Sequence, residues 1–127
     1  SPDHICFVRC ENPEDEHYPA LSAMEEELRQ FQQADGSPYH LTPLPWPDAI
    51  NDNEGERLPA TYANFLIING AVLVPVYDVP QDQAALITFR ELFPDREIVP
   101  IPCRPLIEQH GSLHCVTMQL PAGVVEL

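Results

Sequence analysis

The segment ANFLIINGAVLVPV at residues 63–76 decides the fold expected of this chain. Two apolar runs, residues 63–68 and 71–76, flank Asn69 and Gly70, and an Asn-Gly pair favours the positive φ angles of a tight hairpin turn. Both runs are apolar on both of their faces, which is typical of strands that are covered on either side. The sequence therefore predicts a β-hairpin inside a covered sheet.

A helix and further strands are predicted after the hairpin. Within residues 82–93, Ala85, Leu86, Phe89 and Leu92 recur at the spacing of an amphipathic helix. The remaining expected elements are a strand at 97–101, a short helical turn near 106–109, a last strand at 113–120 and a tail. We therefore expect the C-terminal half to combine strands with one covering helix.

The N-terminal half shows a similar order of elements. A strand is predicted at 4–9, an amphipathic helix at 17–33 with Met24 and Phe31 in the core, and a second strand at 39–44. An acidic loop then covers residues 48–59. In each half an acidic turn leads into a helix. This similarity indicates a divergent internal repeat and an α/β fold.

Composition restricts the partners of this 127-residue chain. Its 20 acidic and 6 basic side chains give a net charge of −14, which disfavours nucleic acid and anionic membranes and attracts small cations. All six basic residues are arginine, which excludes a lysine Schiff base from the chain. No apolar run approaches the roughly 20 residues of a membrane span and no signal peptide is evident, so we expect a cytoplasmic protein.

Four cysteines are candidates for core packing, metal binding or nucleophilic chemistry, because a disulfide framework is not expected without a secretory signal. A zinc site would have to use Cys6 and Cys10, or His110, His114 and Cys115. These spacings do not easily let the ligands converge. The expectation is therefore that the chain holds no metal.

Cys115 differs from the other cysteines in its position. It follows the turn at Gly111 and Ser112, where a thiol can be exposed with backbone N–H groups nearby. In a regular strand His114 would point to the opposite face, so it is a poor candidate for the base. The residues alone leave two interpretations of Cys115 open, a nucleophile and a buried core cysteine.

Several ordered motifs of the chain resemble one family. These are RLPATYANF at 57–65, INGAV at 68–72, LFPDR at 92–96 and GSLHC at 111–115, together with residues 12–18 and LPWP at 44–47. They resemble the C-terminal part of the agmatine deiminases and the related bacterial-type peptidyl-arginine deiminases. The resemblance extends along essentially the whole chain.

The resemblance implies a partial pentein fold, a β/α-propeller, here made of about two ββαβ-type modules at residues 1–60 and 61–127. The family's nucleophile corresponds to Cys115. Its catalytic histidine belongs to a His-x-Asp motif that this chain does not contain. We therefore expect the histidine and the substrate-binding carboxylates in missing N-terminal modules, and an isolated chain without turnover.

The implied reaction is hydrolysis of agmatine to N-carbamoylputrescine and ammonia through a covalent cysteine intermediate, a step of putrescine biosynthesis, with no cofactor. We expect Asn64, Trp46 and Gly111 to contact the substrate. Two alternatives stay open, a peptidyl-arginine deiminase and a non-catalytic binding or assembly module. Open strand edges of an incomplete propeller also favour a homo-oligomer.

Overall fold

The computed structural model describes residues 1–124, which form two units that each join parallel strands through a helix. In the first unit, β1 (His4–Arg9) leads through α1 (Tyr18–Leu28) to β2 (His40–Pro45), and β1 pairs with β2 in parallel. Pro19 lies in the first turn of α1, where no intrahelical N–H is needed. The two strands form a sheet of their own.

The second unit begins with the predicted hairpin. β3 (Leu66–Ile68) pairs antiparallel with β4 (Ala71–Val76), and Gly70 takes a φ of 78° in the turn between them. Helix α2 (Gln81–Leu92) then returns the chain to β5 (Glu97–Pro102), which pairs with β4 in parallel. A short helix α3 (Arg104–Ile107) and a 3-10 turn η1 (His114–Val116) complete the described elements.

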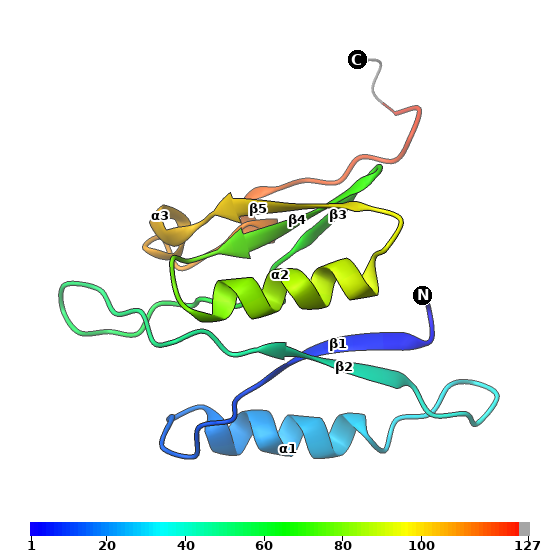
Figure 1. Ribbon diagram of the computed structural model, residues 1–127, viewed down its shortest axis with the longest axis horizontal. Coiled ribbons are helices and arrows are strands. Elements are labelled where there is room, and N and C mark those ends of the chain that lie inside the picture. Colours follow the sequence, from blue (N-terminus) through cyan, green and yellow to red (C-terminus); the bar gives the residue numbers. More distant parts are fainter. Residues whose placement is uncertain (125–127) are drawn as a thin grey trace.

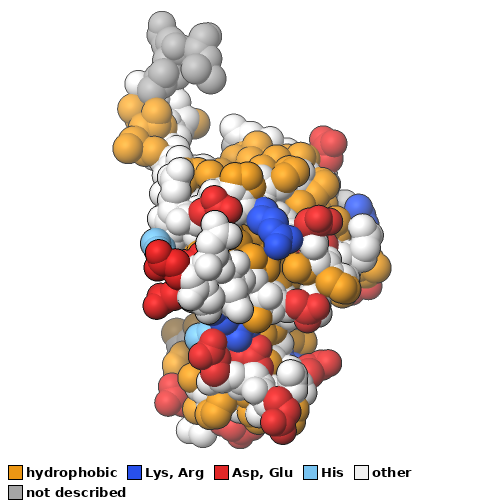
Figure 2. All heavy atoms as spheres, turned by 90° about the vertical axis from the view of Figure 1, so that its left-hand side faces the viewer, with side chains coloured by type: hydrophobic (Ala, Val, Ile, Leu, Met, Phe, Trp, Pro, Cys, Tyr) orange, Lys and Arg blue, Asp and Glu red, His pale blue; other side chains and the backbone are white. Residues whose placement is uncertain are grey.

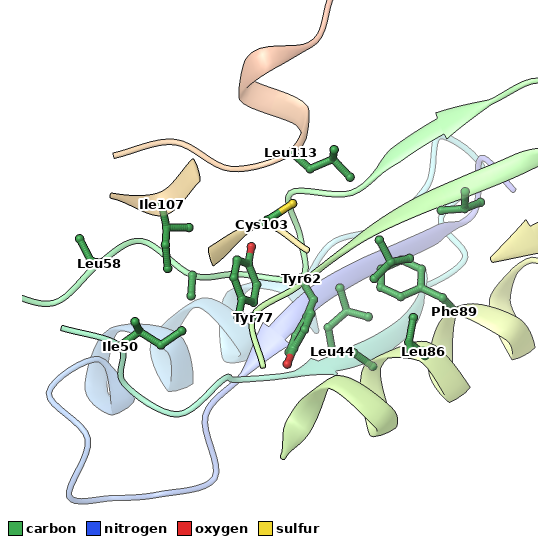
Figure 3. Close-up of a cluster of buried hydrophobic side chains, with 14 residues drawn as sticks. Leu44, Ile50, Leu58, Tyr62, Tyr77, Leu86, Phe89, Cys103, Ile107 and Leu113 are labelled. Carbon is green, nitrogen blue, oxygen red and sulfur yellow. The ribbon is translucent and has the colours of Figure 1, made fainter. Parts of the chain in front are cut away.

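The core lies where α2 is enclosed by the two sheets (Figure 1). Phe89 of α2, Leu44 of β2 and Val72 and Val74 of β4 are all fully buried. Figure 3 shows Leu44, Leu86 and Phe89 in the same cluster as Tyr62 and Tyr77. This shared apolar contact fixes the second unit, which carries the candidate site, against the first.

Two expectations about burial are wrong. Helix α1 ends at Leu28, because residues 32–38 form a tight antiparallel turn in which the N–H of Gln33 donates to the carbonyl of Ser37. Phe31 therefore leaves the apolar stripe and is 50% exposed. Met24 is only half-buried, like the rest of the apolar face of α1, in which no residue is buried.

The hairpin is covered along its second strand but only at the start of its first. Val72, Val74 and Pro75 of the central strand β4 are buried, and so is Leu66 of β3, but Ile67 and Ile68 are 40% and 41% exposed. Strand β3 is short and lies at the edge of the sheet order β3-β4-β5, so one side of it has no neighbouring strand among the described residues. The prediction of a hairpin with both strands covered is therefore wrong for β3.

The predicted last strand at 113–120 is also wrong. The chain forms the single turn η1 instead, in which the N–H of Val116 donates to the carbonyl of Leu113 and that of Thr117 to His114. From Thr117 to the end of the described chain it continues without a strand partner. The segment forms no strand because the hydrogen bonds of the turn around Cys115 take the place of pairing with a neighbouring strand.

Candidate active site

Cys115 lies in the middle of η1 with its thiol exposed. The other three cysteines are covered to different degrees: Cys10 and Cys103 are buried and Cys6 is half-buried. Burial raises the pKa of the Cys6 and Cys103 thiols. Exposure thus separates Cys115 from all the other thiols of the chain.

The side chain of Asn64 contacts the turn at three points. Its Oδ1 accepts hydrogen bonds from the backbone N–H of His114 at 2.7 Å and of Cys115 at 3.3 Å. Its Nδ2 donates to the sulfur of Cys115 at 3.1 Å. The carboxamide therefore holds both the backbone and the thiol of the nucleophile candidate, and the structure brings these two predicted site residues together.

Hydrogen-bond donors favour the thiolate of Cys115. The backbone N–H of Ser112 makes the largest contribution to lowering the pKa of this thiol, followed by the Nδ2 donor of Asn64. No charged side chain is among these causes. The thiolate character of Cys115 therefore depends on the shape of the turn, and in the described residues no imidazolium supports it.

Gly111 supplies space for Cys115. A Cβ atom built at this position would lie 3.3 Å from the Cβ of Cys115 and 4.0 Å from its sulfur. A larger side chain would therefore crowd the nucleophile candidate. The prediction that Gly111 contacts the substrate stays a prediction, but its place beside the thiol is clear.

Trp46 is held in a different cluster. Its Nε1 donates to Asp15 at 3.2 Å, and the guanidinium of Arg57 lies 5.3 Å from the centre of its ring. Trp46 also lines a hollow of about 590 Å³ beside β2 and α2, and Cys115 is not among the residues that line it. The structure does not bring Trp46 into contact with Cys115, so its expected role toward the substrate stays a prediction.

The structure adds a group of buried hydroxyls that the sequence did not reveal. Tyr77 follows β4, is fully buried, and places its hydroxyl 2.7 Å from that of Ser112, which is also buried. The same tyrosine oxygen donates to the carbonyl of Thr61 at 2.9 Å. A buried tyrosine at the end of an apolar strand needs a hydrogen-bond partner, but the sequence does not indicate which residue provides it.

The zinc alternative finds no support in the described structure. Within residues 1–124 there is no group of three or more His, Cys, Asp or Glu side chains that could hold a metal ion. His114 and Cys115 lie in one 3-10 turn, not on the opposite faces of a strand as expected.

Comparison with known proteins decides the family. A profile of Porphyromonas-type peptidyl-arginine deiminases matches residues 1–121. The chain belongs to this family. An agmatine deiminase of Pseudomonas fluorescens is 33% identical over 138 aligned positions, which cover 95% of the chain and 38% of that protein. The resemblance inferred from the motifs is therefore confirmed.

Solved structures of family members superpose well on the chain. A candidate arginine deiminase of Porphyromonas gingivalis is 61% identical with a TM-score of 0.91, and the match covers 94% of the chain and 35% of that protein. A substrate-bound agmatine deiminase of C. jejuni is 38% identical with a TM-score of 0.79, over 88% of the chain and 32% of that protein. The chain thus spans about a third of the length of these relatives. None of its described helices is long and apolar enough to cross a membrane.

Proposed function

We propose that this chain is the C-terminal part of a guanidine deiminase and carries its nucleophile, Cys115. One observation supports the proposal most strongly: the thiol is exposed, accepts a hydrogen bond from Asn64, and has its pKa lowered by the backbone N–H of Ser112 and by Asn64. Thiolate is the reactive form of cysteine, and a guanidinium is a poor electrophile that needs a strong nucleophile.

In the proposed reaction the sulfur of Cys115 attacks the central carbon of the guanidinium and forms a tetrahedral adduct. One amino group of the adduct receives a proton and leaves as ammonia. A covalent thiouronium then remains on the sulfur. Water then attacks the same carbon, the C–S bond breaks, and the ureido product leaves with the thiolate restored. For agmatine the product is N-carbamoylputrescine, which belongs to putrescine biosynthesis.

Two further parts of the reaction fall to residues outside the chain. An acid must protonate the departing ammonia, and carboxylates must hold the remaining guanidinium nitrogens. We propose that both come from N-terminal modules of the same pentein propeller, in which residues 1–60 and 61–127 are about two modules. The chain matches about a third of the length of its relatives, which supports the proposal that further modules belong to the complete enzyme. No cofactor is needed.

The substrate we propose is agmatine. The relatives from Pseudomonas fluorescens and C. jejuni are agmatine deiminases, and the C. jejuni protein was solved with substrate bound after replacement of a cysteine by serine. The net charge of −14 attracts a dicationic amine, and Figure 2 shows acidic side chains spread over one face of the molecule.

Peptidyl arginine is the second candidate substrate. The family profile carries that name, and a structure described as a candidate peptidyl-arginine deiminase is 50% identical with a TM-score of 0.91. A peptide substrate needs an open approach to the thiol. Cys115 is exposed in this chain, and the further modules would decide whether a peptide can reach it.

Affinity labelling of the chain tests the nucleophile. Chloroacetamidine mimics a guanidinium, and we expect it to modify Cys115 selectively, with the adduct located by mass spectrometry and absent in Cys115→Ser. Cys6→Ser serves as the control and keeps the labelling. Equal modification of all four cysteines would contradict the proposal and leave a non-catalytic binding module. Ammonia release from agmatine in the same samples would show that no further module is needed.

A further inference from the structure

A pair of buried hydroxyls joins the two segments that form the candidate site. Tyr77 and Ser112 are 0% and 1% exposed, and their hydroxyl oxygens are 2.7 Å apart. Tyr77 lies just after β4, while Ser112 lies between α3 and η1, so this contact joins distant parts of the chain.

The direction of the hydrogen bonds follows from counting protons. The hydroxyl of Tyr77 has one proton, which it donates to the carbonyl of Thr61 at 2.9 Å. The hydrogen bond between the two hydroxyls must therefore run from Ser112 to Tyr77. The result is one directed series from Ser112 through Tyr77 to the carbonyl of Thr61.

Each end of the hydroxyl pair leads directly to a site residue. On one side, the N–H of Asn64 donates to the carbonyl of Thr61 at 3.3 Å, the same carbonyl that Tyr77 contacts. On the other side, Ser112 lies three residues before Cys115, in the segment that leads directly into η1. Tyr77 and Ser112 thus stand between the residue that holds the thiol and the turn that presents it.

We propose that Tyr77 and Ser112 are positioning residues, whose hydroxyl–hydroxyl hydrogen bond sets the orientation of Cys115 relative to Asn64. This inference rests on the proposed function in that Cys115 is taken as the nucleophile. It adds that the reactivity of the thiol depends on a buried contact that no substrate reaches.

Tyr62 offers a comparison within the same core. It is as fully buried as Tyr77, and their ring centres are 5.7 Å apart. Its hydroxyl donates to Asp82 at the start of α2, at 2.7 Å. Figure 3 shows that the two hydroxyls point in opposite directions, that of Tyr77 toward Cys103 and that of Tyr62 away from it. Replacing Tyr62 therefore removes an equivalent buried hydroxyl without touching the turn.

The experiment measures the rate of Cys115 alkylation by iodoacetamide from pH 6 to pH 10, with the adduct located by mass spectrometry. In Tyr77→Phe and in Ser112→Ala we expect alkylation at pH 7 to be about three- to tenfold slower, the range expected for one ordinary hydrogen bond, with the profile displaced to higher pH. Tyr62→Phe is expected to keep the wild-type profile. The double variant Tyr77→Phe with Ser112→Ala should be no slower than Tyr77→Phe alone, because that change already removes the contact between the two hydroxyls.

Two results are distinguishable. If Cys115 of the folded chain reacts no faster than in denaturant, the proposed function fails. If the wild-type thiol is activated and Tyr77→Phe gives the same profile as Tyr62→Phe, the positioning role fails alone. Thermal melts show whether Tyr77→Phe stays folded at the assay temperature. If it does not, the alkylation profile of Ser112→Ala, which is the smaller change, tests the positioning role.

Discussion

The carboxamide of Asn64 contacts Cys115 on both its backbone and its side chain: the oxygen accepts the N–H at 3.3 Å, and the nitrogen donates to the sulfur at 3.1 Å. One side chain therefore determines both where the thiol lies and how readily it ionises. The two residues are 51 positions apart and are separated by the hairpin, α2 and β5, so the thiol is activated only when the second unit is folded.

Substitutions of Asn64 separate these two effects. Asn64→Asp keeps an oxygen for the backbone N–H groups but places a negative charge beside the sulfur, so we expect the pKa of Cys115 to rise and alkylation at pH 7 to fall about tenfold or more. Asn64→Ala removes the donor without adding charge and should cost less reactivity. The pH profile of iodoacetamide alkylation measures both, and the exposed Asn53→Ala is the control. Equal profiles for Asn64→Asp and the wild type would contradict this.

Gly111→Ala tests the steric requirement. The added Cβ would lie 3.3 Å from the Cβ of Cys115, so that either the turn or the thiol must shift by a few tenths of an ångström. We expect slower labelling by chloroacetamidine at every pH and a displacement of the alkylation profile smaller than that of Asn64→Asp. Labelling at the wild-type rate would show that the turn accommodates the added Cβ without any loss of thiol reactivity, which would contradict this prediction.

The ion pair between Arg57 and Asp15 predicts a contribution to stability that depends on pH. Two hydrogen bonds of 2.8 Å and 3.0 Å from Arg57 lower the pKa of Asp15 to about 2, against an unfolded value of 3.8. Because the folded pKa is the lower one, this contribution is complete above about pH 4 and is lost as the pH falls toward 2. The shift corresponds to about 2 kcal/mol.

Asp15→Asn checks that assignment. Urea unfolding at pH 6 and pH 2.5 should show a larger difference in the free energy of unfolding for the wild type than for the variant. Asp95→Asn, an exposed carboxylate in the turn before β5, is the control and should behave like the wild type. If the variant loses as much stability toward low pH as the wild type, Asp15 is not the group responsible.

Charge attraction of the proposed substrate, agmatine, predicts a dependence on salt. We expect agmatine to protect Cys115 from iodoacetamide, and the concentration for half protection to rise several-fold between low salt and about 1 M NaCl, where the screening length falls to about 3 Å. N-carbamoylputrescine, with one charge fewer, should protect less and depend less on salt. Stronger protection by an arginine-containing peptide than by agmatine would instead favour the peptidyl-arginine alternative.

The sequence predicted those elements whose signals are local. Strand β1 has the bounds expected from its residues, and Gly70 occupies the hairpin turn because an Asn-Gly pair favours positive φ. The predicted strand at 113–120 failed because the decisive contact of that segment, with Asn64, is made across the tertiary fold. The early end of α1 has a similar reason, since a turn closed by Gln33 and Ser37 competes with the helix.

The candidate site was predictable in part. Cys115 and Asn64 were both expected from the sequence and lie in contact, but the role of Tyr77 could not be anticipated. A tyrosine after an apolar strand is first of all a core residue, and only the folded chain shows which hydroxyl it meets. Trp46 was also expected to contact the substrate, which stays a prediction; the structure shows its contacts with Asp15 and Arg57.

The nucleophile candidate sits on a single 3-10 turn that is held to the sheet largely by side-chain hydrogen bonds, and it lies outside every strand ladder. Chemistry and architecture are therefore separable in this part of the molecule. A protein engineer could change the acidity of the thiol through positions 64, 77 and 112 while leaving the backbone pairing of β3, β4 and β5 as it is.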